Sequence, residues 1–558
     1  MLITFGDPAD PRSAYYSRER PPVKVLFAAL HNGYYRNFDS VVEELARRGH
    51  EIHLGTERED SGVGGHPIVN RLTTTFANVT CGRTAVRDSE SLFLASKIRL
   101  AIDYLRYFEP AYGASSGLWV RARERTPAGM LHVARSPLLA WRPIRRALAH
   151  VLDAADRAVP EAPEIERYLD QQRPDLIVVT PLIGLVASSQ IDVLRSAIRR
   201  RIPTAVMVWS WDHLSSKALI RDVPDALVVW NDVQKHEAVT MHAVPEARIV
   251  VTGAQSCDRW FGRIPTRSRT EFVRHVGLAD ERPYVLWAGS ALLPGTPPEP
   301  GIFLRWASHL RRSSNPQLRD VPILLRPHPA RTAEWASCDW RSVGNIVMFG
   351  DQPVDEQSRE DYFESLHYSA GIVGITTTAF LEAAVVGRPV MSFYADDLVP
   401  EHEASLHFQY LADPEHGLLT MARSLEEHER HLSAVLTGPP ADLMERQQRF
   451  VHHFVRPRGM DISATSIVAD ALERLPAAPR LATATAASIV GRLAWRQLQR
   501  LEHHPRWRYL ILDERERDRE GRQLLRTQER ERALARKREA KQLALERKRA
   551  EKDREMRT

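Results

Sequence analysis

The segment Arg326-Pro327-His328-Pro329 directly follows an apolar run, 321–326, that is typical of a buried strand. The two prolines fix the backbone on either side of His328, so its imidazole projects from a stiff loop at the carboxyl edge of a sheet. Arginine and histidine both donate hydrogen bonds, and charged donors form the stronger ones. We predict that Arg326 and His328 bind a diphosphate. The alternative is a turn that ends the strand, with His328 partly buried.

A second motif combines hydroxyl groups with the start of a helix. Thr376, Thr377 and Thr378 follow a predicted strand over 371–374 and precede a predicted helix over 378–386. Hydroxyls and the free N–H groups of a starting helix attract an anion, and the helix dipole adds to this. Glu382 lies four residues after Thr378 on the same helix face, where its carboxylate can accept both ribose hydroxyls of a nucleotide. An ordinary cap and a solvated glutamate are the alternative, which leaves the three consecutive threonines unexplained.

Two residues that follow a third strand could also contact such a ligand. Gly289 and Ser290 come directly after the apolar run 284–288. We predict that these two residues approach a phosphate or a donor sugar. That they form an ordinary turn without a ligand contact is an equally supported alternative. The three motifs together therefore predict a nucleotide site in the second half of the chain.

Candidate bases lie in the first half of the chain. His31 follows the first strand, and a histidine suits removal of a hydroxyl proton near neutral pH. The alternative is that His31 is only a polar turn residue within the sequence HNGYYRN. Asp212, in the sequence WSWDHLSSK after another strand, is the second candidate for the base. The alternative role of Asp212 is structural: it would form an Asx turn that caps the next helix. The neighbouring tryptophans could stack on acceptor sugars, although core packing is the commoner role of tryptophan.

Two alternating series of strands and helices must position these residues. Apolar runs predict strands over 23–30, 51–54, 176–180, 204–209, 226–230 and 248–252, and then over 284–288, 321–326, 346–349, 371–374 and 390–393. We therefore predict an α/β fold with two Rossmann-like, doubly wound domains. The predicted boundaries are an extension over 1–22, an acceptor domain over 23–265 with a helical insertion at about 84–170, and a donor domain over 266–475. Helices within 440–475 are expected to cross back to the first domain.

Composition narrows the class of protein. The chain has 558 residues, of which 43% are hydrophobic and 27% charged, which is typical of a soluble protein with more than one core. No apolar run reaches the roughly 20 residues of a spanning helix, and the first residues do not resemble a secretory signal. The three widely spaced cysteines indicate reduced thiols and show no metal-ligand spacing. These features predict a cytoplasmic protein.

The net charge of +6 is concentrated at the end of the chain. Residues 513–558 hold 17 Lys and Arg against 12 Asp and Glu, a surplus of five that leaves about +1 for everything before them. A basic surface for nucleic acid is therefore not predicted. The segment 513–558 is predicted to be a long charged helix. The basic amphipathic segment 476–512 is predicted to dock onto the protein itself, and peripheral attachment to the inner face of a membrane is the alternative.

The RPHP loop followed by GITTTAFLEAAVVGRPV resembles the donor-binding half of GT-B-fold glycosyltransferases. The likeness is to bacterial capsule-polysaccharide and CDP-glycerol glycerophosphotransferase-type enzymes, and it spans roughly residues 23–400. In that family an H-P dipeptide and a Ser/Thr pair hold the nucleotide phosphates, which corresponds here to His328-Pro329 and Thr377-Thr378. The resemblance implies a UDP-, CDP- or CMP-linked donor, a glycan or lipid-linked acceptor, and no bound metal or tightly held cofactor.

Two other functions share this expected architecture. A UDP-sugar 2-epimerase would use a similar glutamate-bearing helix, but it needs acid and base carboxylates around C2 of the sugar, and the sequence shows no obvious set. An inactive scaffold that recruits partners through its charged tail is the other alternative, and the retained RPHP and threonine loops argue against it.

Overall fold

The structure is a computed structural model of the whole chain. It describes residues 21–59, 65–112, 116–182, 187–217, 219–279, 282–292, 296–395, 398, 406–478, 488–504, 506–520 and 522–523. Most of the predicted charged tail over 513–558 therefore lies outside the described residues.

Seven parallel strands form the sheet of the first domain, in the order β3-β2-β1-β4-β5-β6-β7. Alternate residues of β1 face opposite layers of helices: Val25 and Phe27 pack toward α1, while Leu26 and Ala28 pack toward α7 and α8. Both faces are therefore covered, as a parallel sheet requires. The strands are β1 (Lys24–Ala29), β2 (Glu51–Thr56), β3 (Val79–Arg83), β4 (Leu176–Thr180), β5 (Thr204–Met207), β6 (Ala226–Val229) and β7 (Ile249–Val251). The helices around them are α1 (Asp39–Arg47), α2 (Gly65–Thr75), α7 (Pro163–Gln172), α8 (Gln190–Arg199), α9 (His213–Ser216) and α10 (Asp232–His242).

Six parallel strands form the second sheet, in the order β10-β9-β8-β11-β12-β13. Its two faces are again covered, by α14 and α15 on one side and by α12 and α18 on the other. The strands are β8 (Val285–Ala288), β9 (Ile323–Arg326), β10 (Ile346–Met348), β11 (Gly371–Gly374), β12 (Val390–Phe393) and β13 (Thr420–Ala422). The helices are α11 (Arg269–Val276), α12 (Glu299–Arg311), α13 (Pro316–Arg319), α14 (Glu356–His367), α15 (Ala379–Val385), α17 (Leu406–Ala412), α18 (Leu425–Thr437) and α19 (Ala441–Phe450).

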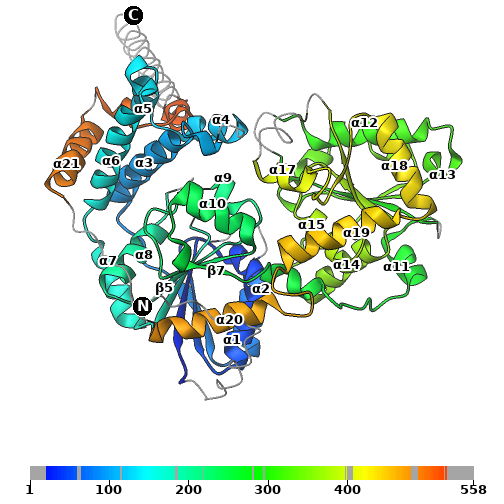
Figure 1. Cartoon of the computed structure of the whole chain (residues 1–558), viewed down its shortest axis with the longest axis horizontal. Helices are drawn as coiled ribbons and strands as arrows, with labels where there is room; N and C mark the ends of the chain where they lie inside the picture. Colours follow the sequence, from blue (N-terminus) through cyan, green and yellow to red (C-terminus); the bar gives the residue numbers. More distant parts are fainter. Residues whose placement is uncertain are drawn as a thin grey trace, which may run out of the picture.

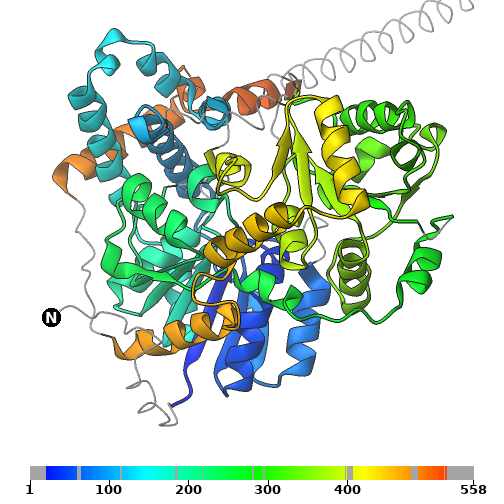
Figure 2. The same ribbon diagram turned by 45° about the vertical axis from the view of Figure 1, so that its right-hand side comes forward.

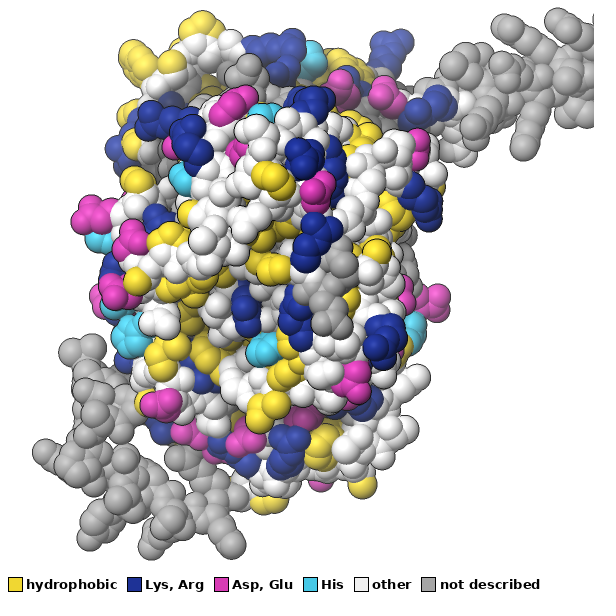
Figure 3. Space-filling view, turned by 90° about the vertical axis from the view of Figure 1, so that its right-hand side faces the viewer, with side chains coloured by type: hydrophobic (Ala, Val, Ile, Leu, Met, Phe, Trp, Pro, Cys, Tyr) yellow, Lys and Arg dark blue, Asp and Glu magenta, His cyan; other side chains and the backbone are white. Residues whose placement is uncertain are grey.

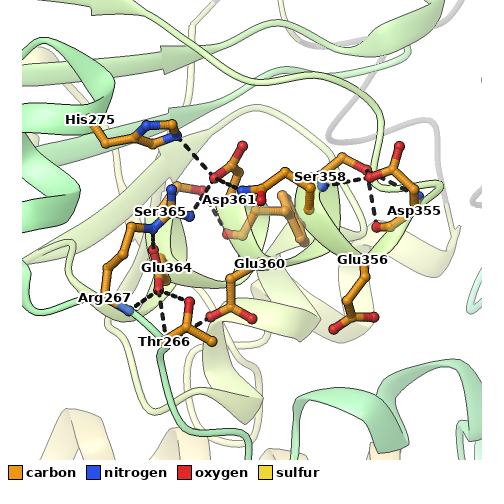
Figure 4. Close-up of polar contacts among 12 residues, drawn as sticks. Thr266, Arg267, His275, Asp355, Glu356, Ser358, Glu360, Asp361, Glu364 and Ser365 are labelled. Atoms are coloured by element: carbon orange, nitrogen blue, oxygen red, sulfur yellow. Dashed lines mark hydrogen bonds and ion pairs between the residues drawn. The ribbon is translucent and has the colours of Figure 1, made fainter.

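These are the two Rossmann-like domains of a GT-B architecture, and they lie side by side in Figure 1. The chain passes from the first to the second through residues 261–268. Glu364 of α14 fastens this connection, because its carboxylate accepts the N–H groups of Thr266 at 3.0 Å and Arg267 at 2.8 Å (Figure 4). Glu360 accepts from the same Thr266 N–H at 3.0 Å. The chain returns through α19 to α20 (Ala464–Arg474), which packs against α1 of the first domain (Figures 1 and 2).

A helical lobe stands apart from both sheets, and it contains α3 (Ser89–Arg106), α4 (Ser116–Arg125), α5 (Ala128–Ala134), α6 (Arg142–Arg157) and α21 (Ile489–His503). The central helix α3 packs against α6 and α21 with one side and against α5 with the other. Trp495 of α21 is buried in this packing, which confirms that the amphipathic segment docks onto the protein. Among the described residues, none of the helices is both long and apolar enough to span a bilayer.

The structure adds elements that the apolar runs did not reveal. The edge strands β3 and β13 and the helix α2 were not predicted, since β3 has the mixed sequence VTCGR and exposes most of its side chains. His428 lies in α18, whose highly charged sequence, LEEHERHLSAVLT, would suit a solvated face. Its ring is fully buried against Trp306 and Phe393, because α18 turns this residue toward the second sheet.

A buried carboxylate ties the two domains together. Asp39, at the start of α1, accepts hydrogen bonds from Arg71 of α2 at 3.1 Å, from Arg259, and from Arg359 of α14 at 2.5 Å. Burial alone would raise the pKa of Asp39, but the nearby cations Arg259, Arg359 and Arg71 lower it below its usual value. We call Asp39 and these three arginines the Asp39 cluster.

We predict that Asp39→Asn destabilises the protein by about 3 kcal/mol or more, because it leaves buried guanidinium groups without their counter-charge. The stabilisation from a carboxylate with a lowered pKa is complete above its unfolded pKa near 3.8 and is lost as the pH falls through the lower folded pKa. The difference in unfolding free energy should therefore be largest at neutral pH and shrink below about pH 4. Denaturant titrations at several pH values measure it. Asp170→Asn, at an exposed ion pair, is the matched control, and an equal loss in both variants would contradict the prediction.

Candidate functional site

The residues singled out in the second domain lie at the carboxyl ends of adjacent strands. His328 follows β9, Gly289 follows β8, and the three threonines follow β11, which neighbours β8 in the sheet. A Cβ atom on Gly289 would lie 2.3 Å from the backbone nitrogen of His328, so only glycine lets these two loops approach so closely. The fold therefore brings together the motifs that the sequence analysis predicted separately.

His328 caps the turn that follows it. Its Nδ1 accepts the N–H of Ala330 at 3.2 Å, which leaves the ring hydrogen on Nε2 as a donor. Burial, together with the fields of Arg36 and Arg331, lowers the pKa of His328 to about 4. His328 is therefore a neutral hydrogen-bond donor at physiological pH, whereas the sequence analysis stressed charged donors.

The loop of Thr376, Thr377 and Thr378 is held by Ser290 of its own domain and by Trp211 of the first domain. Ser290 accepts the N–H of Thr376 at 3.1 Å, and its own N–H donates to the buried Glu299 at 3.0 Å. The indole N–H of Trp211, in the first domain, donates to the Thr378 hydroxyl at 3.3 Å. Thr378 itself is exposed. The loop is thus held in place while its hydroxyls stay accessible.

Two predicted ligand contacts become supporting contacts. Ser290 is fully buried, so Gly289 and Ser290 position the neighbouring loops and do not face a ligand. Arg326 is also buried: its guanidinium donates to the carbonyl of Asp351 at 2.9 Å and lies over the ring of Tyr362. This corrects the prediction that Arg326 reaches the diphosphate, because its charged end is enclosed by protein.

Glu382 faces the first domain. The indole N–H of Trp260 donates to its carboxylate at 3.2 Å, and the hydroxyl of Tyr362 donates to its other oxygen. Burial raises the pKa of Glu382, and these two donors together with Arg36 oppose that rise. Each carboxylate oxygen keeps a second lone pair for a ligand hydroxyl.

Arg36 is the residue that the sequence analysis missed. It belongs to a short 3-10 helix, η2 (Asn32–Asn37), which follows β1, and its charge acts on both His328 and Glu382 of the second domain. Arg259 donates to the Arg36 carbonyl at 3.0 Å. Only the arrangement of the domains reveals this cation, although its position directly after a strand was visible in the sequence.

His31 begins the same 3-10 helix. Its Nδ1 accepts the N–H of Gly33 at 3.2 Å, and its ring packs on Tyr34, which in turn meets Trp209. With Nδ1 accepting, Nε2 carries the hydrogen. The base-competent tautomer of His31 therefore gives up the Gly33 hydrogen bond, at a cost of about 1 kcal/mol.

Asp212 is held as an ion. Its carboxylate accepts hydrogen bonds from Ser210 and from Ser216 (2.8 Å), and it pairs with Lys217 at 3.2 Å. Burial would raise the pKa of Asp212, but Lys217, His407 and these hydroxyls hold it far below its usual value. A carboxylate this acidic is a weak base. Its contacts instead fix the loop that precedes α9, and its side chain does not cap that helix.

The comparisons with known proteins add likeness of structure only. No family model matches the chain, and no curated protein matches it. Solved structures similar to it include a glycosyltransferase from Rickettsia africae, with 11% identity over 82% of this chain and 99% of that chain and a TM-score of 0.46. A UDP-GlcNAc 2-epimerase from Neisseria meningitidis, solved with UDP-GlcNAc, has 10% identity, coverage of 81% and 100%, and a TM-score of 0.43. WaaG, a glycosyltransferase involved in lipopolysaccharide biosynthesis, has 13% identity, coverage of 80% and 99%, and a TM-score of 0.43.

We predict that the His328 ring titrates with a pKa of about 4 in the free protein, and that Arg36→Gln raises this pKa by removing a nearby positive charge. Ring carbon–proton resonances, assigned by their loss in His328→Gln, measure both values. His416, an exposed histidine on the same domain, is the control whose ring resonances should be the same in Arg36→Gln and the unmodified chain at every pH. A His328 pKa near 6.5 would contradict the neutral-donor assignment.

Proposed function

We propose that this protein transfers a glycosyl or polyol-phosphate group from a nucleotide-activated donor to a glycan or lipid-linked acceptor. One observation supports this most directly: loops at the carboxyl ends of both sheets converge, with Trp211 bonded to Thr378 and Arg36 acting on His328 and Glu382. Ligands of doubly wound domains bind at such strand ends. In this proposal, the donor-binding groups and the candidate bases lie on opposite sides of one site.

The donor half suits a nucleotide. His328 Nε2 and the hydroxyls of Thr377 and Thr378 donate to the phosphates, and Glu382 accepts the ribose hydroxyls. The positive charge of Arg36 meets the negative charge that develops on the leaving phosphate. The proposed donors are UDP-, CDP- and CMP-linked compounds.

The acceptor half supplies the base. His31 removes the proton of the attacking hydroxyl through Nε2. It does so in the tautomer with the ring hydrogen on Nδ1, in which the hydrogen bond from the Gly33 N–H is broken. Asp212 keeps in place the loop of Trp209, which meets Tyr34, and of Trp211, which bonds to Thr378. We assign the region beside this loop to the acceptor. Synthesis of a cell-surface polysaccharide, such as a capsule, is the pathway that fits a glycan or lipid-linked acceptor.

We predict that His328→Ala and the double variant Thr377→Ala/Thr378→Ala each weaken donor binding at least tenfold, because each loses hydrogen bonds to charged phosphate. A thermal-shift screen of UDP-, CDP-, GDP- and CMP-linked compounds first identifies the donor, since a ligand at 100 times its Kd adds about 2.7 kcal/mol of stability. Calorimetry then gives the affinities.

His416→Ala and Thr437→Ala, both at exposed positions away from the site, are the matched controls for that experiment. The melting temperature without ligand should be nearly unchanged in His328→Ala and in the controls, because none of these side chains lies in a core. The double threonine variant should melt slightly lower, because it also loses the Trp211–Thr378 hydrogen bond. Unchanged donor affinity in both site variants would overturn the donor-site assignment.

We predict that His31→Ala lowers kcat about 100-fold or more with little change in donor affinity, as expected for loss of a general base. Asp212→Asn should have the smaller effect on kcat, because its carboxylate is already committed to Lys217. A transfer assay with the donor found above measures both, with His452→Ala as an exposed control. Full turnover in His31→Ala together with loss in Asp212→Asn would show that the base is Asp212.

A further inference from the structure

The helix α21 leaves one side uncovered after it docks on the lobe. Its buried side holds Trp495, and Gly491 lies so close to α6 that a Cβ atom there would meet the Ala154 carbonyl at 2.1 Å. The outer side exposes three large apolar side chains near the start of the helix. These are Ile489 (69% exposed), Val490 (58%) and Leu493 (54%).

The same outer side is cationic. Arg492, Arg496 and Arg500 are exposed on it, while Glu502, the only acidic residue of α21, is buried. On the face of the molecule shown in Figure 3, by contrast, Lys and Arg side chains are interspersed with Asp and Glu. The exposed Glu90 of α3 pairs with His503 at the end of α21, whereas the apolar side chains lie near its start. Apolar side chains beside arginines, on a helix whose own carboxylate is buried, match a surface that is both apolar and anionic.

Other features of the lobe agree with this. Leu138 and Trp141, in the segment just before α6, are also strongly exposed, at 63% and 69%. Trp507 and Tyr509, which follow α21, are exposed as well, and aromatic rings of this kind favour the level of lipid headgroups.

The lobe is also joined to the candidate acceptor side. Arg106 of α3 donates to the carbonyl of Lys217, the residue that pairs with Asp212. Asp103 of the same helix accepts the N–H of Leu219 at 3.1 Å. A surface that contacts the lobe is therefore connected through α3 to the loop beside the acceptor space.

We propose that the outer side of α21 docks this protein onto an anionic lipid bilayer. The apolar side chains enter the headgroup boundary and the arginines pair with lipid phosphates. This deepens the proposed function by favouring a lipid-linked acceptor. Vesicle binding is measured without donor or acceptor. A negative result would therefore overturn the docking proposal and leave the proposed transfer reaction untouched.

Co-sedimentation of the full chain with vesicles tests the docking. The protein should bind vesicles of 70% phosphatidylcholine and 30% phosphatidylglycerol at low salt, and bind pure phosphatidylcholine vesicles far less. Arg496→Gln/Arg500→Gln should lower the partition coefficient about 25-fold, from about fivefold for each arginine. Ile489→Gln/Leu493→Gln should lower it at least tenfold.

Matched controls keep the test specific to α21. Arg167→Gln/Arg449→Gln removes two exposed arginines elsewhere, and Ile264→Gln removes an exposed isoleucine of the connection between the domains. Both should bind like the unmodified chain, and Arg496→Lys/Arg500→Lys should retain most of the binding because the charges remain. Thermal melting verifies that each variant is folded.

Several outcomes would overturn the proposal. Binding that persists in both α21 variants would assign the attraction to another part of the chain, including the basic residues after 513. Equal binding to neutral and anionic vesicles, or none at low salt, would exclude this docking mode. If light scattering shows a dimer that Ile489→Gln/Leu493→Gln converts to a monomer, and no vesicles sediment the protein, the outer side of α21 joins two copies of the chain.

Discussion

The carboxylate of Asp39 is the constraint on which the arrangement of the candidate site depends. It binds Arg359 of the second domain and Arg259 of the first, and the Arg259 guanidinium also donates to the carbonyl of Arg36. The Asp39 cluster thus sets the position of the second domain and holds the turn that carries Arg36. Because the proposed donor-binding groups and the proposed base belong to different domains, we expect a change in this cluster to alter the distance between them without touching either.

The electrostatics of the site follow from that arrangement. With Arg36 held close by, an imidazolium at His328 would be repelled, and burial disfavours it further, so the ring stays neutral and donates through Nε2. The positive charge is left on Arg36, which comes from the other domain. A phosphate bound between them would therefore contact both domains and favour the arrangement in which they are close. Trp211 and Thr378 add a direct hydrogen bond to the same arrangement.

The sequence predicted those parts of the structure that depend on local pattern. Continuous apolar runs located β1, β4, β8, β9 and β11, because strands buried on both faces need them. It therefore also placed His328 and the threonines at strand ends. It missed β3, whose edge position tolerates polar residues, and it missed Arg36, whose role depends on a neighbour nearly 300 positions away. Nor could it show that Ser290 and Arg326 are buried, because contacts between loops decide this.

Charge counted along the sequence does not show which arginines near the lobe are buried in ion pairs and which are exposed. These arginines divide into two populations. Arg99 of α3 is buried and pairs with Asp156 of α6 and Asp192 of α8, and Arg195 of α8 pairs with the same Asp156, so these contacts join the lobe to α8 of the sheet domain. Arg496 and Arg500 stay exposed on the outside of α21, whose own carboxylate, Glu502, is buried. The buried ion pairs therefore fix the lobe to the first sheet domain. The lobe also contacts the loop of Asp212, because Arg106 of α3 donates to the carbonyl of Lys217, which pairs with Asp212.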